Sequence, residues 1–373
     1  MTSFNVILPE MNNYITTLGG ENQKGLIITF FTISALVSRP FSGKLSDTIG
    51  RKPVIHLGIL ISIVVCLLYP FAHLVSLFLF LRLLHGFSAG FCPTGATALI
   101  TDIIPVHQRG HAMGIWGTFV SLGIGFGQGI GSYFYQLGGF NLLFLTSSLI
   151  GMASLLLALR VTETLQDKQK FDGTQLKIQW QDILEPSVIP SSLVMLLTAP
   201  CSGILFVITP DIAEDLGLLS KGIFLGIYSI PTIFVRLFYG RIFGKLSREK
   251  TMFIALCFLL LSLVLLGIQS SVTTFYFSAI VFGIATGISS PTLFAWTADL
   301  SPEKRRGVGA GTVFIALELG IMIGASSTLF FFDRSLLSIQ YSLGLGFFLV
   351  LMAIIYVLYR IASNKSSIPF QGS

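Results

Sequence analysis

The chain consists mostly of long apolar segments separated by short polar breaks. A helix needs about 20 apolar residues to cross the hydrocarbon core of a bilayer, and eleven segments of this sequence reach that length. Only 11% of the residues are charged, whereas a soluble domain carries about 25%, so most of the surface must face lipid. We predict an all-α membrane protein whose spans lie near 24–43, 54–72, 75–100, 111–137, 140–161, 187–211, 220–242, 250–269, 272–299, 308–332 and 336–360.

Residues 1–18 are a twelfth candidate span, but they are too short to cross a bilayer alone. Only Phe4–Leu8 is continuously apolar before Pro9 and Glu10. We expect this segment to be the outer end of a truncated first helix, so that Met1 is an internal methionine and apolar residues precede it.

The sequence contains an internal repeat. Sliding the chain by 197 residues superposes landmark residues from the second to the fifth helix of each half. The pairs include Arg39 with Arg236, Gly86 with Gly283, Gly90 with Gly287, Asp102 with Asp299, Arg109 with Arg306, Gly123 with Gly320 and Gly127 with Gly324. Such repeats are typical of secondary transporters. We predict two six-helix halves, 1–161 and 187–361, with a cytoplasmic linker, 162–186, and a cytoplasmic tail, 362–373.

The basic residues lie mainly on one side of the predicted membrane. Alternate loops and the tail hold most of the 23 Lys and Arg residues, whereas the opposite loops hold Lys24, Lys221 and Arg334. Basic loops stay in the cytoplasm. We therefore expect a protein of the cell (inner) membrane whose linker and C-terminus lie on the cytoplasmic side. The acids expected to face out are Glu21, Asp211, Glu214 and Asp333. This distribution explains the net charge of +6 without a nucleic-acid partner.

The sequence lacks the signatures of an enzyme, a metal site or an ATP-driven pump. Its four cysteines have no paired spacing and its five histidines are scattered, so we expect no disulfide framework, no metal and no cofactor. The phosphate-binding pattern G-x4-G-K-[S/T] is absent, because Leu45 follows Gly43-Lys44.

The short loop between the second and third spans reads GKLSDTIGRK over residues 43–52. It resembles the signature G-x-L-x-D-R-x-G-R-K of the major facilitator superfamily, with Thr48 in place of the usual Arg. The matching residues are Gly43, Asp47, Gly50, Arg51 and Lys52. The resemblance implies two pseudo-symmetric six-helix bundles and transport by alternating access.

The resemblance also implies a role for Asp47 as a latch at the cytoplasmic face. In that family this carboxylate meets the N-terminus of a helix from the other half, a contact worth about 0.3–2 kcal/mol. Asp102 and Arg109 resemble the partners of this loop, and we expect Asp102 to pair with Arg51 or Arg109. The alternative is a basic loop that only obeys the topology rule.

Two helices carry glycines at helical spacing, which let a neighbouring backbone approach closely. The run in the fifth span resembles the antiporter motif G-x3-G-P-x2-G-G of the same superfamily, with Gln128 in place of Pro. That resemblance favours an exporter. The glycines concerned are Gly86 and Gly90 in the fourth span and Gly123, Gly127 and Gly131 in the fifth.

Four charged residues, Arg39, Arg82, Arg236 and Glu318, lie deep inside predicted spans, away from their ends. Glu318 is about 15 Å deep at 1.5 Å per residue, where a carboxylate must take up a proton or pair with a cation such as Arg236. The resemblance implies that Arg82 faces the central cavity, as does the arginine of the family's second motif, which is tied to proton coupling; alternatively, Arg82 snorkels to the outer interface. Arg39 and Arg236 are expected to line the inner half of the cavity.

Together these features predict a proton-coupled exporter of small molecules that acts as a monomer. The alternatives are a sugar or metabolite importer of the same superfamily, a membrane-embedded enzyme, or a passive channel. The expected partners are a small-molecule substrate, protons and the lipid bilayer.

If Asp47 acts as the latch, Asp47→Asn should lower transport strongly while membrane abundance stays near normal, because the amide lacks the charge that a helix N-terminus attracts. A flux assay on membranes with matched protein amounts measures this. Wild-type flux in the variant would mean that the loop serves topology alone.

Overall fold

The computed structural model describes residues 1–103, 109–165, 168–178, 183–243, 246–268, 271–302 and 306–366. For some residues within these ranges, Asp47 and Arg109 among them, only the backbone is described. The latch expected of Asp47 and the pairing expected of Arg109 therefore lie outside the described side chains.

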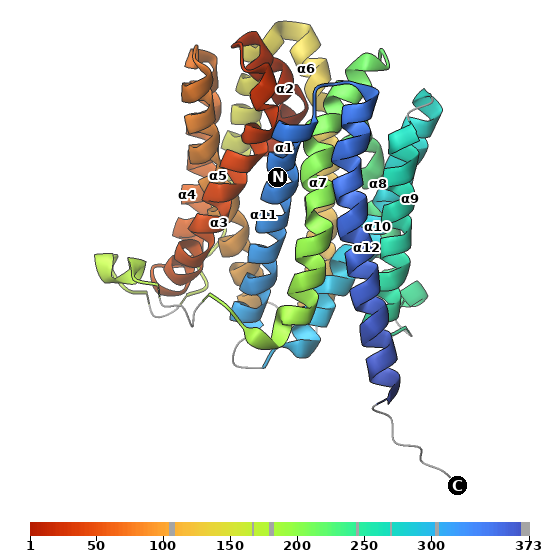
Figure 1. Cartoon of the computed structure of the whole chain (residues 1–373). Coiled ribbons are helices and arrows are strands. Elements are labelled where there is room, and N and C mark those ends of the chain that lie inside the picture. Colours follow the sequence, from red (N-terminus) through yellow and green to blue (C-terminus); the bar gives the residue numbers. More distant parts are fainter. Residues whose placement is uncertain are drawn as a thin grey trace.

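The described part of the chain is helical and contains no strand (Figure 1). Ten of its helices are long and apolar enough to cross a membrane. One of them, α6, contains two spans, because Gly138 and Gly139 leave the helical conformation and turn the chain back. The predicted all-α membrane fold and its long spans are thus confirmed. The elements are α1 (Thr2–Ile7), η1 (Leu8–Glu10), α2 (Met11–Thr17), η2 (Glu21–Gln23), α3 (Lys24–Thr48), α4 (Arg51–Leu68), η3 (Tyr69–Phe71), α5 (Val75–Ile103), α6 (Arg109–Leu159), η5 (Gly173–Leu176), η7 (Pro186–Val188), α7 (Ile189–Asp215), α8 (Ile223–Phe243), α9 (Arg248–Ile268), α10 (Val272–Leu300), α11 (Arg306–Phe331) and α12 (Leu336–Ser366).

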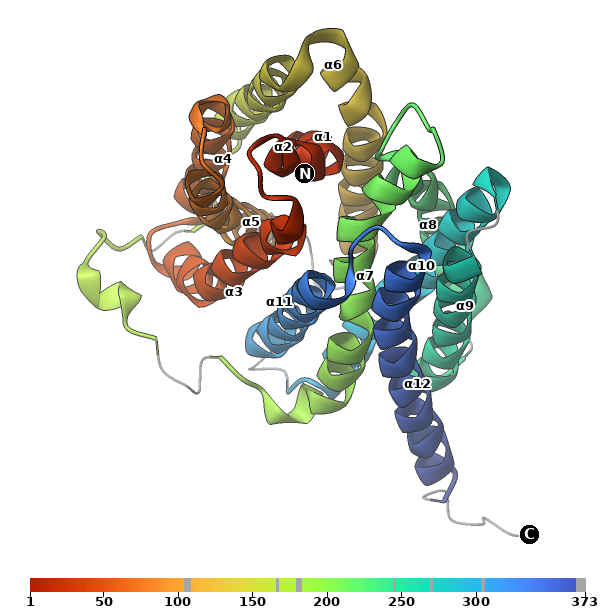
Figure 2. The same ribbon diagram turned by 45° about the horizontal axis from the view of Figure 1, so that its top comes forward.

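The helices form two bundles, α1–α6 and α7–α12 (Figure 2). Across the boundary α3 packs on α11 and α6 packs on α8, and these two pairs are equivalent under the 197-residue shift. The described part of the linker and the last turns of α12 lie at one end of the molecule, at the bottom of Figure 1, which we call the linker end. The other end, where α3 begins, we call the Lys24 end.

The first segment is a short helix broken at Pro9, which lies in the 3-10 turn η1 between α1 and α2. It packs against the glycine face of α6. A side chain added at Gly127 would have its Cβ 2.8 Å from the carbonyl oxygen of Thr2, and one at Gly131 would collide with the carbonyl of Val6. These glycines therefore let α1 and α6 lie backbone to backbone.

The two bundles also meet through small residues, mainly toward the Lys24 end. A side chain at Gly25 would collide with the carbonyl oxygen of Ala325. Four residues further along α3, the Thr29 hydroxyl lies 2.8 Å from the Ser326 hydroxyl of α11. On the other side of the boundary, a Cβ at Gly226 would lie 3.2 Å from the Cα of Gly129. The halves are closely packed at this end.

At the linker end the repeat is visible as two equivalent ion pairs. Arg51 Nε lies 3.0 Å from Asp102 Oδ2 in the first half, and Arg248 Nε lies 2.8 Å from Asp299 Oδ2 in the second. Each pair joins the start of one helix to the end of its neighbour. The pairing of Asp102 with Arg51 was one of the two predicted.

The linker caps α4 through Glu163. Its carboxylate accepts hydrogen bonds from the backbone N–H of Arg51 at 3.1 Å and of Lys52 at 3.0 Å. Gly50, with φ +128°, leaves room for it, because a Cβ there would lie 2.5 Å from Glu163 Oε2. Burial would raise the pKa of Glu163, but four backbone N–H donors outweigh burial and hold its pKa below the usual value.

Glu163→Gln should loosen this cap, because a helix-capping carboxylate is worth about 0.5–1 kcal/mol. A lowered pKa stabilises the contact above the ordinary Glu pKa of about 4.3, and the stabilisation is lost as pH falls through the lowered value. We expect the Arg51 and Lys52 amides to exchange about two- to fivefold faster in the variant at pH 7. Hydrogen exchange measures these rates, and Asp172→Asn, also in the linker, is the control. Equal protection of the two amides in wild type and in Glu163→Gln would contradict the cap.

Candidate functional site

The central feature of the site is an ion pair between the two halves. Arg39 Nη2 of α3 lies 2.7 Å from Glu318 Oε1 of α11, with 15% and 9% of the respective side chains exposed. The Phe314 ring lies under the guanidinium, 4.6 Å from its carbon to the ring centroid. Glu318 therefore does have a cation, but the partner is Arg39 and not the Arg236 proposed as the alternative. The reason is helix packing, since α11 contacts α3 whereas α8 contacts α6.

Arg236 occupies the equivalent place on α8 and also reaches across the boundary. It donates to the carbonyl oxygen of Gly117 at 3.0 Å and to the Ser121 hydroxyl, both on α6, and to the Ser290 hydroxyl at 3.1 Å. Among the described side chains no carboxylate pairs with it. All three acceptors are neutral, so the positive charge of Arg236 is solvated by dipoles alone.

A small pocket lies beside Arg236, where α6 of one half meets α7, α8 and α10 of the other. Its volume is about 100 Å³. The lining combines the arginine with hydroxyl groups and aromatic rings. Its residues are Ser121, Ile124, Ser202, Phe206, Tyr228, Ser229, Thr232, Arg236, Phe282 and Thr286.

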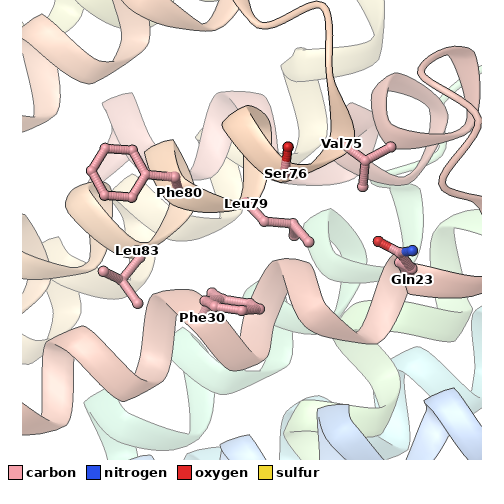
Figure 3. A pocket seen from close by; sticks show the side chains of 7 residues that line it. All are labelled: Gln23, Phe30, Val75, Ser76, Leu79, Phe80 and Leu83. Carbon is pink, nitrogen blue, oxygen red and sulfur yellow. The ribbon is translucent and has the colours of Figure 1, made fainter.

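A larger hollow of about 610 Å³ lies between α3 and α5 near the Lys24 end (Figure 3). Its lining includes Phe30, Leu79 and Phe80 but no charged side chain, and Phe80 is half exposed on the outer surface of the bundle. Ligand sites combine apolar walls with a few converging polar groups. The Arg236 pocket combines a charged group, several hydroxyls and aromatic rings, whereas the larger hollow has only Gln23 and Ser76 as polar lining residues.

Arg82 lies elsewhere, in the interior of the first half. It is 0% exposed, which excludes snorkelling to the interface, and it contacts neither the Arg39–Glu318 pair nor the Arg236 pocket. Its Nε donates to the carbonyl oxygen of Ile27 at 3.2 Å and its guanidinium lies 4.8 Å from the Phe31 ring centroid. In this conformation the Arg82 side chain is enclosed by α3 and its neighbours, and its expected role at the central cavity stays a prediction.

Gly86 and Gly90, on the same helix as Arg82, pack against α3. A side chain at Gly86 would collide with the carbonyl oxygen of Phe31, and one at Gly90 would collide with the Ser38 hydroxyl. These two glycines therefore allow close packing of α5 on α3 within the first half, next to the part of α3 that precedes Arg39.

The Lys24 end holds an ion-pair network that joins the halves. Lys24 Nζ lies 2.6 Å from Asp211 Oδ2, and Arg334 lies 3.2 Å from Asp211 and 2.9 Å from Glu214. Asn12 of the first half also donates to Asp211, at 3.3 Å. Asp211, expected on the outer side of the membrane, lies at the end opposite the linker and is only 2% exposed, because these three residues cover it.

Sequence reasoning missed the partners in this network and the cap formed by Glu163. Lys24 and Arg334 were recognised only as exceptions among the basic residues, and nothing in their spacing points to Asp211, which is 187 residues from Lys24. The signal in the sequence was limited to the position of Lys24 and Asp211, each a charged residue at the edge of a predicted span, one in each half.

The chain matches the family model described as Major Facilitator Superfamily over residues 1–218 and again over 191–372. It is 26% identical over 201 residues to the quinolone resistance protein NorA of Staphylococcus aureus, a match that covers 52% of this chain and about half the length of that relative. It is 24% identical over 365 residues to an uncharacterized MFS-type transporter of Methanocaldococcus jannaschii, covering 96% of this chain and 94% of the relative.

Among solved structures, the human organic anion transporter MFSD10 (TETRAN) superposes with a TM-score of 0.75, covering 95% of each chain. Its sequence identity of 17% makes this a likeness of fold. The helical architecture, the repeat, the loop motif and the family match agree. The chain is a multi-pass membrane transporter that belongs to the Major Facilitator Superfamily.

Proposed function

We propose that this transporter exports small amphipathic molecules across the cell membrane in exchange for protons, with the linker end in the cytoplasm. The observation that carries the proposal is the Arg39–Glu318 ion pair, which bridges the two halves inside the membrane. The basic loops at the linker end support the orientation. The similarity to a staphylococcal protein named for quinolone resistance supports export.

The proposed coupling works through the charge on Glu318. As a carboxylate it holds Arg39, and therefore α3, against α11. When Glu318 takes up a proton, the attraction between opposite charges is lost, and Arg39 keeps at most a hydrogen bond to a neutral acid. The halves then separate more easily at this contact, and return of the proton to the other side restores it.

The Lys24 end is the part that must open for release to the outside. In the structure it is closed by the Lys24–Asp211 pair, by Arg334 and by the Thr29–Ser326 hydrogen bond. Alternating access requires the two halves to rock about a central site. These contacts therefore form in the state closed to the outside and break in the state open to it.

Glu318→Gln mimics the protonated acid, so it should reduce proton-driven flux at least tenfold while substrate exchange without a gradient persists. Flux in vesicles under an imposed pH gradient, with exchange measured in parallel, tests this. Glu10→Gln provides the comparison, because Glu10 is also buried but lies in η1, away from Arg39. If Glu318→Gln kept wild-type gradient-driven flux, Glu318 would not be the coupling residue. If only Glu10→Gln lost this flux, Glu10 would be the coupling residue.

A disulfide between Thr29→Cys and Ser326→Cys should lock the Lys24 end, because their hydroxyl oxygens are 2.8 Å apart and a disulfide needs Cβ atoms within about 4.5 Å. The four native cysteines are replaced first. We expect oxidation to abolish net flux and a reductant to restore it.

The matched control is Ser191→Cys with Thr297→Cys, whose hydroxyl oxygens are 2.9 Å apart on α7 and α10 of the same half. Oxidation of this pair should leave flux unchanged, because it joins helices that move together. Undiminished flux in a fully oxidised Thr29–Ser326 cysteine pair would contradict alternating access at this end.

A further inference from the structure

The internal repeat relates the two arginines that cross between the halves, and it relates their partners as well. Arg39 and Arg236 are 197 residues apart, and so are Ser121 and Glu318. Arg39 donates to Glu318, and Arg236 donates to Ser121. The geometry is therefore duplicated, but the carboxylate is present in only one of the two copies.

The side chain of Arg236 is left with unused bonding capacity. Its Nε is buried and has no hydrogen-bond partner among the described residues. Its terminal nitrogens reach one carbonyl and two hydroxyls. A guanidinium carries five donors in a fork that matches a carboxylate, and a buried charge without a counter-charge is costly. An incoming anion would therefore find a site already arranged for it.

The adjoining pocket suits an anion attached to an aromatic ring. Ser229 and Thr232 supply further hydroxyls, while Phe206, Tyr228 and Phe282 supply ring surfaces. None of the residues that line it carries a negative charge. At about 100 Å³ the pocket is smaller than the 300 Å³ or more of a site for a whole drug-sized ligand, so it fits one end of such a molecule.

We propose that this pocket is a subsite for the carboxylate of an aromatic substrate, and that the substrate supplies to Arg236 the counter-charge that Glu318 supplies to Arg39. The inference rests on the proposed transport function and names its substrate class. A bound carboxylate would tie Arg236 of α8 to a ligand held against α6, so that each of the two arginine contacts between the halves contains an ion pair when substrate is bound.

A purely structural role is the competing explanation for Arg236. Its bonds to Gly117 and Ser121 tie α8 to α6, and that role would need no ligand. A second competitor is an inorganic anion such as chloride, which would satisfy the charge without any preference for an aromatic ring. The two explanations predict different binding behaviour and can be separated.

The test is equilibrium binding to the purified full-length protein in lipid nanodiscs, without any gradient. The probes are 2-naphthoate and 2-naphthamide, which share a ring system and differ in charge. We expect naphthoate to bind at least tenfold more tightly than naphthamide in gluconate buffer. Equal affinities for the two probes would overturn the proposal. It would also be overturned if chloride, added at constant ionic strength, abolished the preference for naphthoate and left naphthamide binding unchanged.

Two variants locate the binding at this pocket. Ser121→Glu supplies the missing carboxylate within the protein, and Ser121→Gln adds the same bulk without the charge. Both should weaken both probes, but only Ser121→Glu should remove the preference for naphthoate. A preference that survives in Ser121→Glu would place the anion site elsewhere and overturn the proposal. Thermal unfolding of the unliganded variants verifies that both are folded. If either variant does not fold, the comparison of the two probes on the wild-type protein still tests the proposal.

This experiment separates the subsite from the transport proposal. The binding preference is measured without a proton gradient, so it does not depend on coupling. Proton-independent flux together with an intact naphthoate preference would reject the proposed coupling and keep the subsite. Proton-coupled flux together with equal affinity for the two probes would do the reverse.

Discussion

The ion pair between Arg39 and Glu318 is the charged contact between α3 and α11, two helices that otherwise meet through small residues and hydroxyl groups. Removing one partner of a buried ion pair costs about 3–5 kcal/mol, whereas a hydrogen bond such as that between Thr29 and Ser326 contributes about 0.5–1.5 kcal/mol. The packing of α3 on α11 therefore depends mainly on one charge. Lipid cannot replace that charge, and the proposed coupling uses the protonation state of this one carboxylate to change how α3 packs on α11.

The repeat explains why the molecule has two kinds of inter-helix ion pair. Arg51–Asp102 and Arg248–Asp299 are equivalent, and each joins helices of the same half. These symmetric pairs brace each bundle as a unit. At the boundary the symmetry of charge is broken, because one copy has a carboxylate and the other a hydroxyl. Rigid halves suit the proposed mechanism, in which one bundle rocks against the other.

Much of the fold could be predicted from the sequence, because membrane spans follow from local composition. The break at Gly138 and Gly139 falls between the predicted spans 111–137 and 140–161. The pairing of Asp102 was also within reach, since it joins adjacent helices. The partner of Glu318 was not, because it depends on which helices pack across the boundary, and 279 residues separate it from Arg39. The burial of Asp211 was missed for the same reason, as residues of both halves cover it.

The way the linker attaches sets a limit on how far the two halves can part. Glu163 binds the start of α4, the Gln169 N–H donates to Thr48, and the Lys177 carbonyl accepts from Lys44, so this stretch is fastened to the first half. The Ile183 carbonyl already accepts from Thr312 of the second half. The six residue steps from Lys177 to Ile183 can extend to about 20 Å at most. As long as these hydrogen bonds hold, this short segment limits how far the two halves can separate at the linker end.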